Sequence, residues 1–239
     1  MEKARSPGCP VPVDQWSGIA CKSTFLTGSP CSARPSCYAQ ELEVHHPLDW
    51  PDRHRGGDAR IWLAGPAMLG GVAKLWMVSD SLDAADAIVV LGGRVDVGPI
   101  AAADLHKRGI APRVAVGVSD FDQGQNGRLN RAALLENGVP SSAIVDFNFR
   151  PHSTYGEARG FLDWAKTSGA RSVVVPIDFF PSCRVRWIFN HELAPAGIRV
   201  IVQSVTPPCY SVNDWWQHRA GWRSFGSELI KFAYYRLKY

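Results

Sequence analysis

The sequence is poor in charge and contains no run of basic residues. Asp, Glu, Lys and Arg make up 20% of its 239 residues, and the net charge is +4. Nucleic-acid-binding domains usually carry a basic patch or stripe, so we expect no nucleic-acid partner. Internal repeats and low-complexity segments are also missing, which excludes solenoids, coiled coils and collagen-like chains. The hydrophobic content of 46% is sufficient for a buried core and excludes a wholly disordered chain.

The sequence also lacks the motifs of three large enzyme classes. It has no G-x-G-x-x-G, no G-x-x-x-x-G-K-S/T and no G-x-S-x-G. These absences argue against a conventional dinucleotide site, a P-loop and the nucleophile of an α/β-hydrolase. Cys183 is expected at a helix start, where a thiolate is stabilised, but no histidine base is evident for it.

Six cysteines are present, and none of them forms a C-x-x-C pair. Cys31, Cys37, His45 and His46 are the candidates for a zinc site. The C-x(5)-C spacing falls outside the usual ligand spacing, so we expect no metal site.

Residues 1–60 lack the periodicity of a folded domain. The segment is rich in proline, and its apolar residues follow neither the period of a helix nor that of a strand. We expect a poorly ordered N-terminal extension. Its first residues lead into prolines and not into an apolar run, so they do not resemble a signal peptide. A start codon assigned too far upstream would give the same pattern.

Residues 61–78 form a long apolar run that we expect to be a helix, with two interpretations. One is a membrane anchor with its N-terminus inside, because arginines precede the run and aspartates follow it. The other is a helix packed on the following domain, which Pro66 and Lys74 favour. Both interpretations stay open.

Residues 79–239 show alternating strand and helix patterns. Five short apolar runs predict strands: Ala87–Leu91, Val114–Val118, Ala143–Val145, Val173–Pro176 and Val200–Val202. The runs are continuous, as expected when both faces of a parallel sheet are covered. Helical patterns begin near Pro99, at Asn126, at Thr154 with the spacing of a capping box to Glu157, and near Ser182. We predict an α/β, Rossmann-like, doubly wound and mostly parallel five-stranded sheet with a C-terminal helical tail.

In such sheets, ligands bind at the carboxyl ends of the strands near the switch in strand order. This rule selects eight candidate ligand-binding residues: Gly92, Gly93, Asp120, Thr154, Glu157, Asp178, Ser182 and Arg184. The glycines would let the backbone approach a ligand closely, and Arg184 could bind an anion through its planar guanidinium group. Asp178 could contact a ligand or act in acid–base chemistry, or it could cap a helix. A capping box alone would explain Thr154 and Glu157. No residue is assigned a catalytic role.

Several segments together resemble the YdcF/SanA/ElyC family, a domain of unknown function. They are Asp86–Gly93, Ala102–Pro112, Asn137–Pro140, Ser153–Ala158, Val174–Trp187, and the tail residues Asp214–Trp216, Gly221, Glu228, Lys231 and Tyr234–Tyr235. The resemblance covers about residues 74–239. It implies a Rossmann-like domain, often anchored in a membrane, with a role in bacterial cell envelope biogenesis.

The resemblance and the strand-end residues suggest a protein that binds a small nucleotide-like or anionic ligand. Whether it is an enzyme is open. One alternative is a transferase dependent on S-adenosylmethionine, a cofactor that the resemblance suggests. Another is a non-catalytic, membrane-tethered interaction protein, which is suggested by the aromatic residues of the tail: Trp215, Trp216, Trp222, Phe225, Tyr234 and Tyr235. The same tail also fits a helix that docks on the domain with Phe225, Leu229 and Phe232 on one face. The expected location is the inner membrane with the domain facing the periplasm, and the alternative is the cytoplasm.

Overall fold

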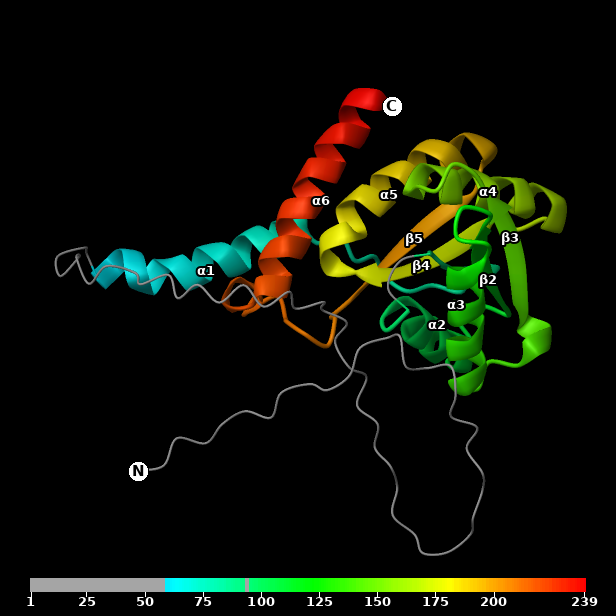
Figure 1. Cartoon of the computed structure of the whole chain (residues 1–239), viewed down its shortest axis with the longest axis horizontal. Helices are drawn as coiled ribbons and strands as arrows, with labels where there is room; N and C mark the ends of the chain where they lie inside the picture. Colours follow the sequence, from blue (N-terminus) through cyan, green and yellow to red (C-terminus); the bar gives the residue numbers. More distant parts are fainter. Residues whose placement is uncertain (1–58, 93–94) are drawn as a thin grey trace, which may run out of the picture. The chain divides into compact units, whose positions relative to one another are not determined.

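A five-stranded sheet forms the centre of the protein, whose computed structural model describes residues 59–92 and 95–239. The strands are β1 (Ala87–Val90), β2 (Arg113–Ser119), β3 (Ile144–Phe149), β4 (Ser172–Asp178) and β5 (Arg199–Val205). All four pairings are parallel, and the order across the sheet is β3-β2-β1-β4-β5 (Figure 1). The predicted Rossmann-like α/β fold is therefore confirmed.

The chain builds this sheet in two directions from its middle. It runs outward from β1 to β2 and β3, then returns to place β4 on the other side of β1 and β5 beyond it. Ile88 of β1 is in register with Val114 of β2 and Val174 of β4, and all three are fully buried. The strand order thus reverses between β1 and β4, which is where such sheets bind ligands.

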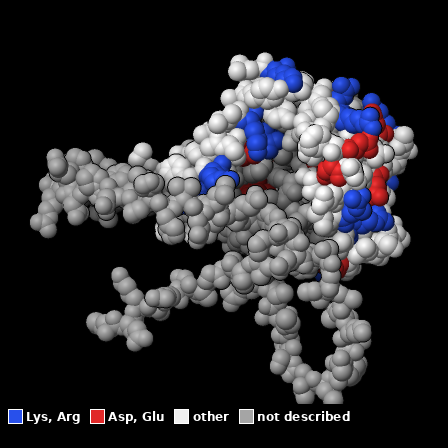
Figure 2. Space-filling view, in the orientation of Figure 1, with Lys and Arg blue, Asp and Glu red and all other residues white. Residues whose placement is uncertain are grey.

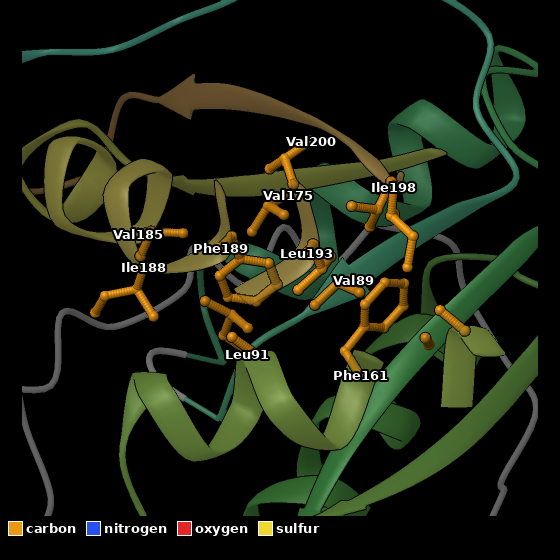
Figure 3. Packing of buried hydrophobic residues seen from close by; sticks show 14 of the residues in the cluster. Val89, Leu91, Phe161, Val175, Val185, Ile188, Phe189, Leu193, Ile198 and Val200 are labelled. Carbon is orange, nitrogen blue, oxygen red and sulfur yellow. The ribbon is translucent and has the colours of Figure 1, made fainter. Parts of the chain in front are cut away.

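Helices cover both faces of the sheet. Helices α4 (Thr154–Ser168) and α5 (Phe179–Leu193) pack on one face, where Phe161, Phe189 and Leu193 lie against β-strand residues such as Val89 and Val175 (Figure 3). Helices α2 (Gly98–Lys107) and α3 (Gln125–Glu136) belong to the core of the other face. Short 3₁₀ turns occupy Ser141–Ala143, Ala194–Ala196 and Trp215–Gln217.

Two further helices pack together beside the sheet. Helix α1 (Ala59–Trp76) ends against helix α6 (Arg219–Lys238), where the Trp76 ring makes an edge contact with Phe232 at a centroid distance of 5.4 Å. The Trp76 indole N–H donates to the Phe180 carbonyl at 2.8 Å, and Trp215, which is fully buried, donates to the Leu69 carbonyl at 3.2 Å. The C-terminal part of α1 is therefore attached to the domain. In the part of the chain that the structure describes, none of the helices has the length and apolar character needed to cross a membrane.

The structure refines several predicted boundaries. The five strands lie where the apolar runs predict them, but most extend further into polar residues at their ends. Helix α3 begins after Gly124, whose positive φ of 73° suits glycine, and not at Asn126 as predicted. Helix α5 begins at Phe179, before the predicted start at Ser182. The expected N-terminal extension and the candidate zinc ligands Cys31, Cys37, His45 and His46 lie outside the described residues, apart from the first residues of α1.

Candidate functional site

A cavity of about 620 Å³ lies at the carboxyl ends of β1 and β4, where the strand order reverses. This volume is in the range of small-molecule sites. Figure 2 shows a hollow beside α6 with red atoms of Asp or Glu residues within it. The polar groups of the wall come from the ends of both strands, the start of α4, the start of α5 and the inner side of α6. They are His152, Ser153, Thr154, Glu157, Asp178, Arg184, Ser224, Ser227, Glu228, Lys231, Tyr234 and Tyr235.

The start of α4 differs from the predicted capping box. Ser153 is the N-cap, and its hydroxyl accepts the Gly156 N–H at 3.1 Å. The Glu157 side chain does not turn back to the helix end. Instead, its Oε1 accepts the N–H of Gly92, just after β1, at 2.5 Å. Interpreting Thr154 and Glu157 as a cap is therefore wrong, and both side chains face the cavity instead.

Glu157 is a buried carboxyl group with an altered acidity. Its side chain is 7% exposed, and burial raises its pKa from 4.5 to about 7, against smaller lowering effects of the Gly92 N–H and the Arg184 charge. Its second oxygen, Oε2, has no hydrogen-bond partner among the described residues. Among the described residues, Asn130 Oδ1 is the one side-chain nitrogen or oxygen atom that is fully buried and has no hydrogen-bond partner. Because Glu157 Oε2 also has no partner but is not fully buried, it remains accessible from the cavity.

Glycine residues allow these elements to approach one another. A Cβ on Gly92 would lie 3.2 Å from Glu157 Oε1 and would crowd the hydrogen bond between them. A Cβ on Gly156 would lie 1.9 Å from the Pro151 carbonyl oxygen, which is too close for two non-bonded atoms. A side chain at position 92 would therefore force the Glu157 carboxyl group to shift slightly, whereas the close turn before α4 requires glycine at position 156.

Arg184 joins three elements at the cavity wall. Its Nε donates to Glu228 Oε2 of α6 at 2.6 Å, and its Nη1 donates to Thr154 Oγ1 of α4 at 2.6 Å. Lys231 donates to the other Glu228 oxygen at 3.0 Å. The remaining nitrogen of Arg184, Nη2, has no hydrogen-bond partner among the described residues. Two cations thus share one carboxylate, which gives this side of the cavity a net positive charge.

Asp178 caps helix α5 and also lines the cavity. It is the N-cap of α5, and its Oδ1 accepts the Phe180 N–H at 3.3 Å. Its Oδ2 accepts the Tyr210 hydroxyl at 3.0 Å. The residue is 5% exposed and lines the cavity. Capping and proximity to a ligand are therefore compatible at this position.

Of the eight candidate residues, Gly92, Thr154, Glu157, Asp178 and Arg184 line the cavity. The other three do not belong to its described wall. Asp120 is exposed after β2 and forms an ion pair with Arg150. Ser182 is fully buried, accepts the Val78 N–H at 2.9 Å and donates to the Phe179 carbonyl at 2.6 Å, so it has a structural role. Gly93 lies outside the described residues.

Sequence reasoning missed the contribution of α6. Ser224, Ser227, Glu228, Lys231, Tyr234 and Tyr235 all line the cavity. A signal was present, because these polar residues recur at intervals of three and four and therefore share one side of a helix. His152 was also missed; its ring stacks on Phe121 at a centroid distance of 4.9 Å beside the cavity.

The wall of the cavity combines positively charged groups with carboxyl groups. Arg184, Lys231 and the N-terminus of α4 supply positive charge, because helix N-termini carry partial positive charge. Glu157 and Asp178 supply carboxyl groups that can accept hydrogen bonds from a ligand. Within the described ranges, no three His, Cys, Asp or Glu side chains are grouped as a metal site would require.

In the comparisons with known proteins, no family model matches the sequence, and no curated protein matches it either.

Proposed function

We propose that this protein binds a small molecule with an anionic group in the cavity between β1, β4 and α6, and that Glu157 exchanges a proton with it. The observation that carries the proposal is the position of Glu157. An accessible carboxyl oxygen lies in a cavity at the strand switch point, and the pKa of the group is about 7. Such a group can both donate and accept a proton near neutral pH.

The anionic character of the ligand follows from the charges of Arg184, Lys231 and Glu228 in the cavity wall. Glu228 neutralises one of the two cations that contact it, and a single positive charge remains for a ligand. Arg184 is held rigidly by Thr154 and Glu228, so its free Nη2 is fixed in direction. A phosphate or carboxylate group that binds Arg184 would place a neighbouring hydroxyl or amine of the same molecule toward Glu157.

The wider role stays a proposal that rests on the family resemblance. We propose a function in the biogenesis of the bacterial cell envelope at the inner membrane. S-adenosylmethionine is one ligand to test, because its carboxylate suits Arg184 and its cationic sulfonium suits a wall with two further carboxyl groups, Glu157 and Asp178. A transferase of that kind would use the same cavity.

The test is a thermal-shift screen of the full chain with nucleotides, S-adenosylmethionine, sugar nucleotides and polyprenyl phosphates. A ligand at about one hundred times its Kd stabilises the native state by about 2.7 kcal/mol, which a melting experiment detects readily. The affinity for any hit is then measured by calorimetry in two variants of the wall, Lys231→Gln and Glu157→Gln. A folded wild-type protein that gives no shift with the whole panel would contradict the proposal.

The matched control is Arg186→Gln. Arg186 is an arginine of the same helix, but it pairs with Asp80 and does not line the cavity. We expect Lys231→Gln to weaken the binding of an anionic ligand about tenfold, and Arg186→Gln to leave the affinity unchanged. Equal affinities in all of these variants would place the ligand elsewhere.

A further inference from the structure

Helix α6 is apolar on two opposite sides, although it packs on the domain with only one. The inner side contacts α1, α5 and the cavity through Phe225, Glu228, Phe232 and Tyr235. On the outer side, Ile230 is 74% exposed and Leu237 is 89% exposed. Leu229 was expected on the docking face with Phe225 and Phe232, but it is 40% exposed. A helix that packs on a soluble domain normally has a polar outer side.

The outer apolar residues form a continuous stripe. With about 100° of rotation per residue, Trp222, Leu229, Ile230, Ala233 and Leu237 fall within one arc of the helix surface. Trp222 is half exposed, as is Tyr234 at the edge of the arc. The stripe therefore runs along most of α6.

Cations border this stripe, and acidic residues do not. The basic residues of α6 are Arg219, Arg223, Lys231, Arg236 and Lys238. The same rotation places Arg223 along one border of the stripe and Arg236 along the other, and Arg219 lies within the arc at the start of the helix. Lys238 and Lys231 lie about 80° and about 100° beyond Ile230, on the side of the cavity. The single acidic residue of the helix, Glu228, is 3% exposed and faces inward. Figure 2 shows blue patches between white areas along the course of α6.

Helix α1 adds a second exposed apolar face next to the first. Met68, Val72 and Leu75 recur at helical spacing and are 69%, 40% and 90% exposed. Trp76 of α1 packs against Phe225 and Phe232 of α6, so the two helices are neighbours. Among the described residues, most of the large apolar side chains that are exposed thus belong to α1 and α6.

We propose that the outer face of α6 lies on the surface of an anionic lipid bilayer. An apolar stripe with arginine along both borders is the pattern of helices that lie in the membrane interface, where the cations contact lipid phosphates. A second copy of this chain is a poorer occupant, because it would bring the basic residues of two α6 helices together. This proposal does not depend on the proposed function of the cavity.

The orientation has a consequence for the cavity. Tyr234 belongs to the cavity wall, and it also lies at the edge of the outer stripe of α6. A bilayer contacted by α6 would therefore lie next to the cavity opening on this side. The cavity would then receive its ligand near the membrane surface.

The test measures binding of the full chain to vesicles by flotation. Phosphatidylglycerol vesicles are compared with phosphatidylcholine vesicles at low and high salt. We expect binding to the anionic vesicles that salt weakens, and a loss of about tenfold or more in the variant Ile230→Glu/Leu237→Glu, because two exposed apolar anchors are replaced by charges. Both positions are exposed, so the variant should fold, and circular dichroism and thermal melting check this.

The matched control is Leu129→Glu/Leu135→Glu on α3, where the two leucines are 47% and 44% exposed. This variant should bind the vesicles as the wild type does. Unchanged vesicle binding in the α6 variant would overturn the proposal, as would equal binding to both kinds of vesicle. A dimer in solution that the α6 substitutions dissociate would assign the stripe to a second copy instead.

Discussion

Arg184 of α5 and Glu228 of α6 form an ion pair with 2.6 Å between Nε and Oε2, and their side chains are only 8% and 4% exposed. The pair links the C-terminal helix to the end of the sheet, because Arg184 also donates to Thr154 at the start of α4. Helix α6 is thereby part of the cavity and not an appendage. The position of its inner polar residues depends on this contact.

Replacing Glu228 should destabilise the protein strongly. In Glu228→Gln, the guanidinium of Arg184 stays buried without its opposite charge, and breaking one partner of a buried pair typically costs about 3–5 kcal/mol. The free energy of unfolding from urea titrations measures this. The double variant Arg184→Met/Glu228→Leu should recover most of the loss, because it leaves no buried charge unpaired.

The control for this prediction is Lys231→Gln, which removes the outer cation of the same carboxylate. The Lys231 side chain is 52% exposed, so its contribution to stability should stay within about 1 kcal/mol. A Glu228→Gln variant as stable as the wild type would show that the pair does not hold α6 in place.

The stability of the protein should fall between mildly acidic and neutral pH because of Glu157. The pKa of this group is about 7 in the native state and about 4.5 in the unfolded state, so the native state binds the proton more tightly. The free energy of unfolding therefore decreases as the pH rises between these two values, by up to about 3 kcal/mol. Urea titrations at about pH 5 and about pH 8 measure the difference.

The matched variant for the pH experiment is Glu157→Gln. The glutamine amide oxygen can still accept the Gly92 N–H, but the side chain does not titrate. The decrease in the free energy of unfolding between the two pH values should therefore be smaller by the contribution of Glu157. Asp86 acts in the opposite direction and at lower pH. The pKa of Asp86 is lowered by the Arg171 N–H, the Ser172 hydroxyl and the Ser172 N–H, which all donate to its carboxylate. Its contribution to stability is therefore lost as the pH falls through this lowered pKa. Identical pH profiles in wild type and Glu157→Gln would contradict the assignment.

The sheet was predictable because its signals are local. Each strand is a short apolar run, and the neighbouring residues Ile88 and Val89, which belong to the cores of opposite faces, are both fully buried, as a parallel sheet covered on both faces requires. The rule that ligands bind at strand ends selected Gly92, Asp178 and Arg184, and the structure brings these three residues to one cavity. These inferences needed only the order of elements along the chain.

The rest of the site depends on contacts between distant segments. Thr154 and Glu157 have the spacing of a capping box, but Arg184 and Gly92 compete for their side chains and Ser153 caps the helix instead. Ser182 precedes Arg184 by only two residues, yet it points toward Val78 and not toward the cavity. No local pattern distinguishes these outcomes, because each is decided by a partner more than 25 residues away or by the geometry of a neighbouring cap.

Replacing Ser182 should affect stability and not ligand binding. Ser182→Ala removes the acceptor of the Val78 N–H and the donor to the Phe179 carbonyl, which should cost about 1–3 kcal/mol. Thermal melting and ligand affinity are measured together. The control is Ser227→Ala in the cavity wall, an exposed position at which the stability should change by less than about 0.5 kcal/mol. A weakened affinity in Ser182→Ala at unchanged stability would return this residue to the site.

Two glycine-to-alanine substitutions in helices should have opposite effects. In α4, a Cβ on Gly160 would lie 2.4 Å from the Asn148 carbonyl oxygen and 2.7 Å from the Phe149 Cβ, so the helix must move away from β3. Gly160→Ala should therefore destabilise the protein by about 1–3 kcal/mol. In α6, a Cβ on Gly226 meets no atom within 4 Å. Gly226→Ala should stabilise it by up to about 1 kcal/mol, because alanine is the better helix former.

The comparison isolates close packing from helix propensity, since both variants gain the same methyl group within a helix. Urea titrations of the two variants and the wild type give the free energies of unfolding. Because α4 carries Thr154 and Glu157 into the cavity, the Gly160 variant should also bind the ligand less tightly, while Gly226→Ala binds it normally. A stabilised Gly160→Ala variant would show that α4 does not approach β3 as closely as the structure has it.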